Sequence, residues 1–477
     1  MRQEENSLKS NIIYQILYQI LALIVPLITS PYIARILGSA GLGTYSYTYA
    51  IANYFVMFAM LGIMNYGNRE VALAKTDIQK CSQLFWNVFF IHILNGLLSL
   101  LIYIAVVVVF FKDYRAIAMV QALFIVSAVF DISWLYFGLE KFKMTTIVSC
   151  INKVLTTVLI FLLIKEPKDV LLYAGIIAGG TLFNNVIYWA FLKKQIVFCT
   201  PNFKDSIKHI RPLVVLFIPV IAVSVYKYMD KIMLGIMMTT TDVGIYEAAE
   251  KFINLPMCVI SALGTVMLPR ITNLKAKNDI KTVQQYNYIS MMFVMFVSCG
   301  MSFGLAGISD VFIPWFYGTE FQASSKILLI LLPSIVFVSW ANVIRTQCLL
   351  PAGNDKLYCM SVILGAAVNL CANVLLIPNC GIAGAAIGTT IAEFFVCLVQ
   401  TIAARREMNF KTYFKDSAIY VLVGFLMMVI ISRVNLKSVV VTIVTRIIVG
   451  GLIYACLSSP FLKRSVKNLG IKDRNQR

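Results

Sequence analysis

The sequence predicts an all-α polytopic membrane protein with about fourteen transmembrane helices. Hydrophobic residues make up 60% of the 477 residues and charged residues only 13%, whereas soluble domains are about half apolar and a quarter charged. The apolar residues gather into stretches of about 20 residues, the length that crosses a bilayer. Lys and Arg residues fall mainly in alternate loops between these stretches, as in multi-pass membrane proteins.

The expected spans follow one another in chain order. They lie near residues 12–37, 43–66, 84–110, 117–138, 145–164, 171–191, 212–237, 244–268, 286–308, 325–348, 358–377, 384–404, 414–432 and 439–461. One constant shift places Gly43 on Gly244, Tyr45 on Tyr246 and Arg69 on Arg270, which indicates a six-span repeat. We therefore predict an N-terminal six-helix lobe (1–192), a basic cytoplasmic linker (193–211), a C-terminal six-helix lobe (212–404), two additional transmembrane helices (405–462) and a basic cytoplasmic tail (463–477).

The net charge of +19 is explained by membrane topology. If the N-terminus is cytoplasmic, the inner loops and both tails hold about 27 of the 41 Lys and Arg residues. This asymmetry predicts cytoplasmic termini and contact with anionic lipid headgroups, with no role in nucleic-acid binding. The eleven cysteines show no CxxC spacing and the two histidines are far apart in sequence, so neither a disulfide framework nor a metal site is expected.

The stretch from Val225 to Lys251 is the main candidate site. It carries three charges of each sign between long apolar segments: Lys227, Asp230, Lys231, Glu247, Glu250 and Lys251. A charge near the bilayer centre costs at least about 2.5 kcal/mol, so these side chains should face one another or water. A short turn near Thr239 would bring Lys231 and Glu247 to similar depth in an antiparallel hairpin. The alternative is that the outermost lysines snorkel to the membrane interface.

Other charges lie within predicted spans. Asp131 and Lys153 are equally far from a short turn, which makes a salt bridge between adjacent helices easy, whether it is structural or functional. The basic side chains would suit an anionic headgroup, because they donate charge-assisted hydrogen bonds to phosphate; they are Arg35, Lys153, Lys227, Lys231 and Arg345. The acidic side chains could carry protons or bind sodium; they are Asp230, Glu247, Glu250 and Glu393. The charges alone do not decide between a substrate clamp formed by the basic side chains and an ion relay formed by the acidic ones.

Enzyme signatures are absent from the sequence. It has no GxSxG, P-loop, HExxH or DxD pattern, and no loop large enough for a soluble active-site domain. We therefore expect no catalytic residues and no cofactor beyond a coupled proton or sodium ion. Two repeated bundles with charges inside them suit a transporter that works by alternating access.

Three motifs carry a family likeness. The segments ARILGSAGLGTYSYTYAIANYF from Ala34, YMDKIMLG followed by VGIYEAAEK from Tyr228, and GIAGAAIGTTIAE from Gly381 resemble the polysaccharide flippases. These are the Wzx-type O-antigen and capsule flippases of the multidrug/oligosaccharidyl-lipid/polysaccharide exporter superfamily. The likeness extends from the first span to about the twelfth.

The resemblance implies a transporter of the bacterial cytoplasmic (inner) membrane that moves an undecaprenyl-diphosphate-linked oligosaccharide from the inner to the outer leaflet for surface polysaccharide synthesis. It supports roles for Asp230, Lys231 and Arg35, which stand in or beside the matching motifs. Membrane lipids, polysaccharide polymerases and glycosyltransferases are the expected partners. The alternatives are an ion-coupled drug or small-molecule antiporter and a lipid II flippase of the same superfamily.

Overall fold

A computed structural model describes the backbone of residues 2–474, and all regular structure in that range is helical. Side chains are described from residue 21 onward, apart from those of residues 22, 23, 219, 222, 223, 225–227 and 462–477. The helices divide into two compact units, Met1–Gly235 and Ile236–Arg477. Each unit has its own apolar core.

The first unit contains eight helices and most of a ninth. They are α1 (Arg2–Met60), α2 (Ile63–Ala74), α3 (Ile78–Phe110), α4 (Arg115–Val129), α5 (Ser133–Gly138), α6 (Phe142–Leu163), α7 (Val170–Ala190), α8 (Phe203–Lys208) and α9 (Ile210–Met237). Helix α1 is broken at Gly38, whose φ of 67° and ψ of −179° suit a residue without a Cβ. The break lies between the first two expected spans, so α1 holds both of them.

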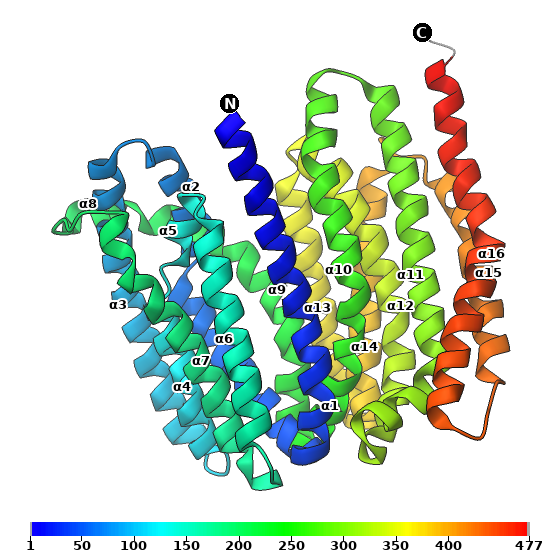
Figure 1. Ribbon diagram of the computed structural model, residues 1–477, viewed down its shortest axis with the longest axis horizontal. Coiled ribbons are helices and arrows are strands. Elements are labelled where there is room, and N and C mark those ends of the chain that lie inside the picture. The colour runs from blue at the N-terminus through cyan, green and yellow to red at the C-terminus, as the bar shows by residue number, and fades with distance from the viewer. Residues whose placement is uncertain (1, 475–477) are drawn as a thin grey trace. The chain divides into compact units, whose positions relative to one another are not determined.

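The second unit contains seven long helices, drawn from green to red in Figure 1. They are α10 (Thr240–Ala276), α11 (Ile280–Tyr317), α12 (Gln322–Ile344), α13 (Asp355–Cys380), α14 (Ile382–Ala404), α15 (Phe410–Ser432) and α16 (Val439–Arg474). Helix α12 continues into a π-helical turn, Arg345–Leu349, and then a 3₁₀ turn, Leu350–Ala352. Helices α11, α15 and α16 pack side by side.

The lengths and hydropathy of these helices confirm a multi-pass membrane protein. Within the described residues, twelve helical stretches are long and apolar enough to cross a bilayer. The first, Ile24–Ala74, includes the break at Gly38 and so accounts for two expected spans. Helix α9 adds a further helix of 28 residues. The prediction of an all-α fold with about fourteen spans is thus confirmed, while the lobe and linker boundaries stay predictions.

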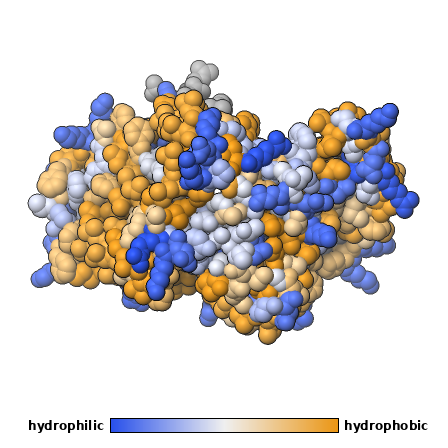
Figure 2. Space-filling view, turned by 90° about the horizontal axis from the view of Figure 1, so that it is seen from below, coloured by the Kyte–Doolittle hydropathy of each residue, from blue (hydrophilic) through white to orange (hydrophobic). Residues whose placement is uncertain are grey.

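The outer faces of the helices suit contact with lipid. Helix α3 exposes large apolar side chains along its length, among them Leu98, Leu101 and Phe110. Figure 2, seen from one end of the helices, shows wide hydrophobic areas interrupted by separate clusters of hydrophilic residues. Exposed apolar surface of this extent is stable where the surrounding solvent is hydrocarbon.

Arg446 joins three helices of the second unit. Its side chain is fully buried, and its Nη1 donates to Asp310 Oδ1 at 2.6 Å and to the Gly307 carbonyl at 2.9 Å. Its Nε and Nη2 donate to the Val434 and Ser432 carbonyls and to Asn435 Oδ1, in the turn between α15 and α16. Gly307 and Asp310 come from α11, far from Arg446 in sequence, whereas the other acceptors lie 11 to 14 residues before it.

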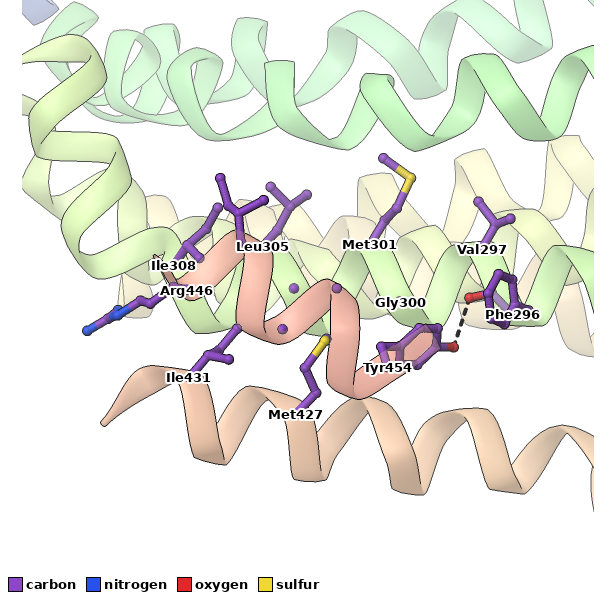
Figure 3. A pocket seen from close by; sticks show the side chains of 14 residues that line it. Phe296, Val297, Gly300, Met301, Leu305, Ile308, Met427, Ile431, Arg446 and Tyr454 are labelled. Carbon is purple, nitrogen blue, oxygen red and sulfur yellow. Dashed lines mark hydrogen bonds between the residues drawn. The ribbon is translucent and has the colours of Figure 1, made fainter. Parts of the chain in front are cut away.

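A cavity of about 400 Å³ lies beside this arginine, between α11, α15 and α16. Its lining is apolar apart from Arg446 and Tyr454. Figure 3 shows Arg446 at one end, with its guanidinium pointing away from the cavity. At the other end the Tyr454 hydroxyl donates to the Phe296 carbonyl at 2.8 Å. The polar groups at both ends are therefore engaged by protein atoms.

Candidate functional site

Asp230 is positioned by the packing of α9 against α1. A Cβ atom on Gly235 would clash with the Tyr47 ring, so α9 can approach α1 this closely only with glycine there. The Tyr54 and Tyr228 rings pack with their centroids 6.2 Å apart. Asp230 is 4% exposed. The first unit thus buries one carboxyl group of the predicted site.

The predicted basic residues of the first unit lie on three helices. Lys231 is half-buried on α9, next to Asp230, and Lys153 is half-buried on α6. Arg35 is exposed on α1, one turn before the break at Gly38. The side chain of Lys227 lies outside the described residues. The structure therefore does not test whether these four form one clamp, which stays a prediction.

Helix α6 turns a polar face toward the interior of the first unit. Its exposed face is apolar, whereas the opposite face carries Ser149, Asn152, Lys153, Thr156 and Thr157. Across the interface, Tyr188 of α7 hydrogen-bonds Ser149 Oγ and accepts from Asn184 Nδ2, both at 3.3 Å. A polar inner face under an apolar outer face is typical of membrane helices that handle polar ligands. Lys153 therefore lies among these polar side chains of α6 and α7, which together form a polar seam in the first unit.

The predicted salt bridge between Asp131 and Lys153 is wrong. Asp131 Oδ1 accepts the Ser133 amide at 2.8 Å and so caps the short helix α5, which follows a break after α4. No ion pair joins Asp131 to Lys153 in the described part of the chain. The prediction assumed two continuous helices, and the break redirects the carboxylate to a backbone amide.

The turn before α10 lies where the sequence placed it. Thr239 caps α10: its Oγ1 accepts the Asp242 amide at 3.3 Å, and Asp242 Oδ2 accepts the Thr239 amide at 3.1 Å. Two turns into the helix, Glu247 pairs with Lys251 at 3.6 Å, across the spacing of four residues that favours such pairs on a helix. Glu250 is half-buried on the same helix. The charges of α10 are thus partly matched within that helix.

A buried polar network crosses the second unit beside these charges. The Tyr246 hydroxyl of α10 meets Thr389 Oγ1 of α14 at 3.2 Å. Thr389 Oγ1 accepts from Asn369 Nδ2 at 3.4 Å, and Asn369 Oδ1 accepts from Asn373 Nδ2 at 3.2 Å. Glu393 follows Thr389 by one turn on α14 and is half-buried. Carboxylate, amide and hydroxyl oxygens of this kind are the ligands that hard cations prefer.

Glycines in GIAGAAIGTTIAE allow this network to form. A Cβ on Gly388 would clash with Asn373 Oδ1, and one on Gly384 would clash with the Leu376 carbonyl. The small residues of this segment thus let α13 and α14 pack closely. The sequence analysis missed Asn369, although Ser361, Gly365, Asn369 and Asn373 repeat every four residues and so mark one polar helix face.

Arg345 opens the π-helical turn at the end of α12. Its Nη1 donates to the Tyr358 hydroxyl at 3.4 Å, and its guanidinium carbon lies 5.6 Å from the centre of that ring. Among the described residues, no three or more His, Cys, Asp or Glu side chains gather into a metal site. Of the predicted site residues, Arg35, Lys153, Lys227, Asp230 and Lys231 thus belong to the first unit, and Glu247, Glu250, Arg345 and Glu393 belong to the second.

The proteins and the family that match this chain in sequence are all named for the synthesis or transport of polysaccharides or glycans. Residues 8–275 match the model of a family described as polysaccharide biosynthesis protein. A protein of Escherichia coli (strain K12) named as an O-antigen transporter is 24% identical over 425 residues, 86% of this chain and 99% of its own length. A protein of Haloferax volcanii named as a low-salt glycan biosynthesis flippase is 26% identical over 234 residues, 49% of this chain and 48% of its own.

Solved structures share the fold. The lipid II flippase MurJ in an inward closed conformation aligns with a TM-score of 0.76 and 16% identity, covering 95% of this chain and all of MurJ. An inward-facing multidrug resistance MATE transporter aligns with a TM-score of 0.62 and 10% identity, covering 82% of this chain and 96% of its own. At these identities the likeness is one of fold.

Proposed function

The chain belongs to the polysaccharide biosynthesis protein family, and from this premise we propose that it is a flippase for lipid-linked oligosaccharides. It moves undecaprenyl-diphosphate-linked repeat units from the inner to the outer leaflet of the bacterial cytoplasmic membrane, for O-antigen, capsule or exopolysaccharide synthesis. The match along almost the full length of a protein named as an O-antigen transporter carries this proposal. Both termini are proposed to be cytoplasmic, on the distribution of Lys and Arg.

The substrate clamp is proposed to be basic. Arg35, Lys153, Lys227, Lys231 and Arg345 are the cations that would meet the diphosphate and the first sugars. Their ammonium and guanidinium groups donate charge-assisted hydrogen bonds, which are about twice as strong as neutral ones. The polar seam around Lys153 would add hydroxyl and amide contacts of the kind that sugars use.

Ion coupling is proposed for the acidic set. Asp230, Glu247, Glu250 and Glu393 would exchange protons or sodium as the protein alternates between inward and outward access. The network of Tyr246, Thr389, Asn369 and Asn373 supports this proposal, since it supplies neutral oxygen atoms beside α10 and one turn from Glu393. The lipid-linked glycan, membrane lipids, polymerases and glycosyltransferases are the proposed partners.

Transport in proteoliposomes tests the function. A fluorescent undecaprenyl-diphosphate oligosaccharide is followed with an impermeant quencher, under imposed proton or sodium gradients. Lys231→Ala and Arg345→Ala should each slow translocation about tenfold or more, since each removes a charge-assisted contact. Lys168→Ala is the control, because Lys168 is exposed in a loop and pairs with Glu166 at 2.7 Å.

Other results would replace this function. Movement of lipid II alone would make the protein a lipid II flippase. Gradient-driven efflux of small cations, with no movement of any lipid-linked glycan, would make it a drug antiporter.

A further inference from the structure

The π-helical turn Arg345–Leu349 is an irregularity in an otherwise regular transmembrane helix. Helix α12 ends at Ile344, and the Leu350 amide then donates to the Arg345 carbonyl, five residues earlier. A single π turn contains one residue more than an α-helix of the same rise, and such turns are frequent at functional sites. Rewinding it to α geometry would turn the side chains on one side of it by about 100° about the helix axis.

Gln347 occupies the middle of this turn without hydrogen bonds. Its side chain is 0% exposed, and neither amide atom has a hydrogen-bond partner among the described residues. Nε of Arg345 is likewise buried without a partner in that part of the chain. A buried amide that makes no hydrogen bond is destabilising, so an arrangement that pairs Gln347 would be favoured at this position.

A complementary group lies at the same level on α11. Asn287 is 2% exposed, and its Oδ1 accepts no hydrogen bond from the described residues. The antiparallel register of α11 and α12 is fixed by Ser302 Oγ, which donates to the Leu332 carbonyl at 3.2 Å. Equal counts along the two helices from this contact place Asn287 at about the same level as Gln347. The Gln347 amide is a donor and Asn287 Oδ1 an acceptor, so the two can satisfy each other.

The present form of the turn is held from α10. Lys275 Nζ donates to the Cys348 carbonyl at 3.2 Å and pairs with Glu407 at 2.7 Å. Thr346 packs close to Gly264 of the same helix, where a Cβ would lie 3.1 Å from the Thr346 methyl. The turn is therefore held from α10, and the unused acceptor on α11 lies at about the same level.

We propose that the Arg345–Leu349 turn is a conformational switch that rewinds from π to α geometry. Rewinding pairs Gln347 with Asn287, releases the Cys348 carbonyl from Lys275 and turns Arg345 relative to Tyr358. The switch goes beyond the flippase function, and only its transport readout rests on that function.

Thiol labelling of the native protein tests the opening of the turn. Cys348 and Cys299 are both buried, at 1% and 0% exposed, but only Cys348 lies in the π turn. N-ethylmaleimide labelling, quantified for each cysteine by mass spectrometry, should modify Cys348 at least about tenfold faster than Cys299. Equal rates at the two cysteines would overturn the switch, whatever the protein transports.

Gln347→Leu tests the role of the amide. Leucine removes a buried amide that makes no hydrogen bond in the π form and cannot pair with Asn287, so we expect a higher thermal midpoint, slower Cys348 labelling and slower transport. Gln400→Leu is the matched control, because Gln400 is equally buried but donates to Ser361 Oγ at 2.9 Å. That variant should lower the midpoint and leave Cys348 labelling unchanged.

The remaining outcomes are also decisive. Unchanged labelling in Gln347→Leu contradicts the switch. If Gln347→Leu does not fold, Asn287→Leu removes the same pair from the other helix and should also slow Cys348 labelling. Unchanged Cys348 labelling in Asn287→Leu would likewise contradict the switch. A parent protein that moves no lipid-linked oligosaccharide refutes the proposed flippase, while labelling and melting still decide the switch.

Discussion

Arg446 shows how a charge can be kept inside the membrane at the scale of one residue. A buried arginine is stable only when its donors are satisfied, and this guanidinium has an acidic partner, an amide oxygen and three backbone carbonyls. Two of those carbonyls belong to Ser432, the last residue of α15, and to Val434 just after it, where no later helical amide donates to them. The same hydrogen bonds therefore satisfy the donors of the buried guanidinium and the carbonyls at the end of α15.

Replacing this arginine should unfold the region around it. Arg446→Met leaves the Gly307, Ser432 and Val434 carbonyls without their donor, at an expected cost of about 3 kcal/mol or more. The thermal midpoint in detergent should fall clearly below that of the parent protein. Arg433→Met, an exposed arginine in the same hairpin, is the control and should melt like the parent. Equal midpoints for the two variants would show that Arg446 is dispensable.

At the scale of the element, helix contacts depend on glycines at defined positions. Gly388→Ala should push Asn373 away from α14, because the new Cβ would clash with Asn373 Oδ1. We expect a lower thermal midpoint and weaker dependence of transport on the ion gradient. Gly451→Ala is the matched control, since no atom lies within 4 Å of the place a Cβ would take there, and alanine favours the helix. A Gly388→Ala protein with parental melting and coupling would disprove the packing argument.

The start of α11 makes stability depend on pH. Asp279 accepts the Thr282 amide at 3.1 Å, and hydrogen bonding to Thr282 holds the pKa of this carboxyl below its usual range. A lowered pKa in the folded state stabilises the fold above the ordinary aspartate pKa, and that contribution is lost as pH falls through the folded-state value. Asp279→Asn keeps the cap without the titration. The difference in thermal midpoint between the parent protein and Asp279→Asn should therefore shrink as the pH falls from about 6 to about 3. A difference that stays constant over this range would show that Asp279 does not make stability depend on pH.

The sequence predicted elements better than contacts. Apolar runs of membrane length located the spans, and the short turn expected near Thr239 precedes α10. Breaks inside helices were harder to foresee: the end of α4 redirected Asp131, and the π turn after Ile344 left no trace in hydropathy. Partners distant in sequence, such as Asp310 for Arg446, require knowledge of which helices are neighbours. The spacing of four residues between Asn369 and Asn373 predicts that they share one helix face, but the candidate site residues include charged residues alone.

At the scale of the whole molecule, the arrangement of charge predicts topology. The loop containing Lys204 should be cytoplasmic and the loop containing Lys168 should face outward, because basic residues concentrate in alternate loops. Single substitutions Lys204→Cys and Lys168→Cys, labelled in intact cells with a membrane-impermeant maleimide, test this. Both side chains are exposed. Only Lys168→Cys should be labelled before the cells are opened; the reverse pattern would invert the proposed orientation and with it the direction of transport.

The contact between Arg446 and Asp310 also sets an order for biogenesis. The two residues are 136 positions apart, so α11 is synthesised and inserted long before its arginine partner emerges. Until α16 arrives, the Ser432 and Val434 carbonyls lack the donor that they have in the finished protein. Helix α16 therefore completes the hydrogen bonding of α11 and of the end of α15, both of which are synthesised before it. A chain that stops short of α16 therefore leaves these carbonyls and Asp310 without the arginine that joins them in the folded protein.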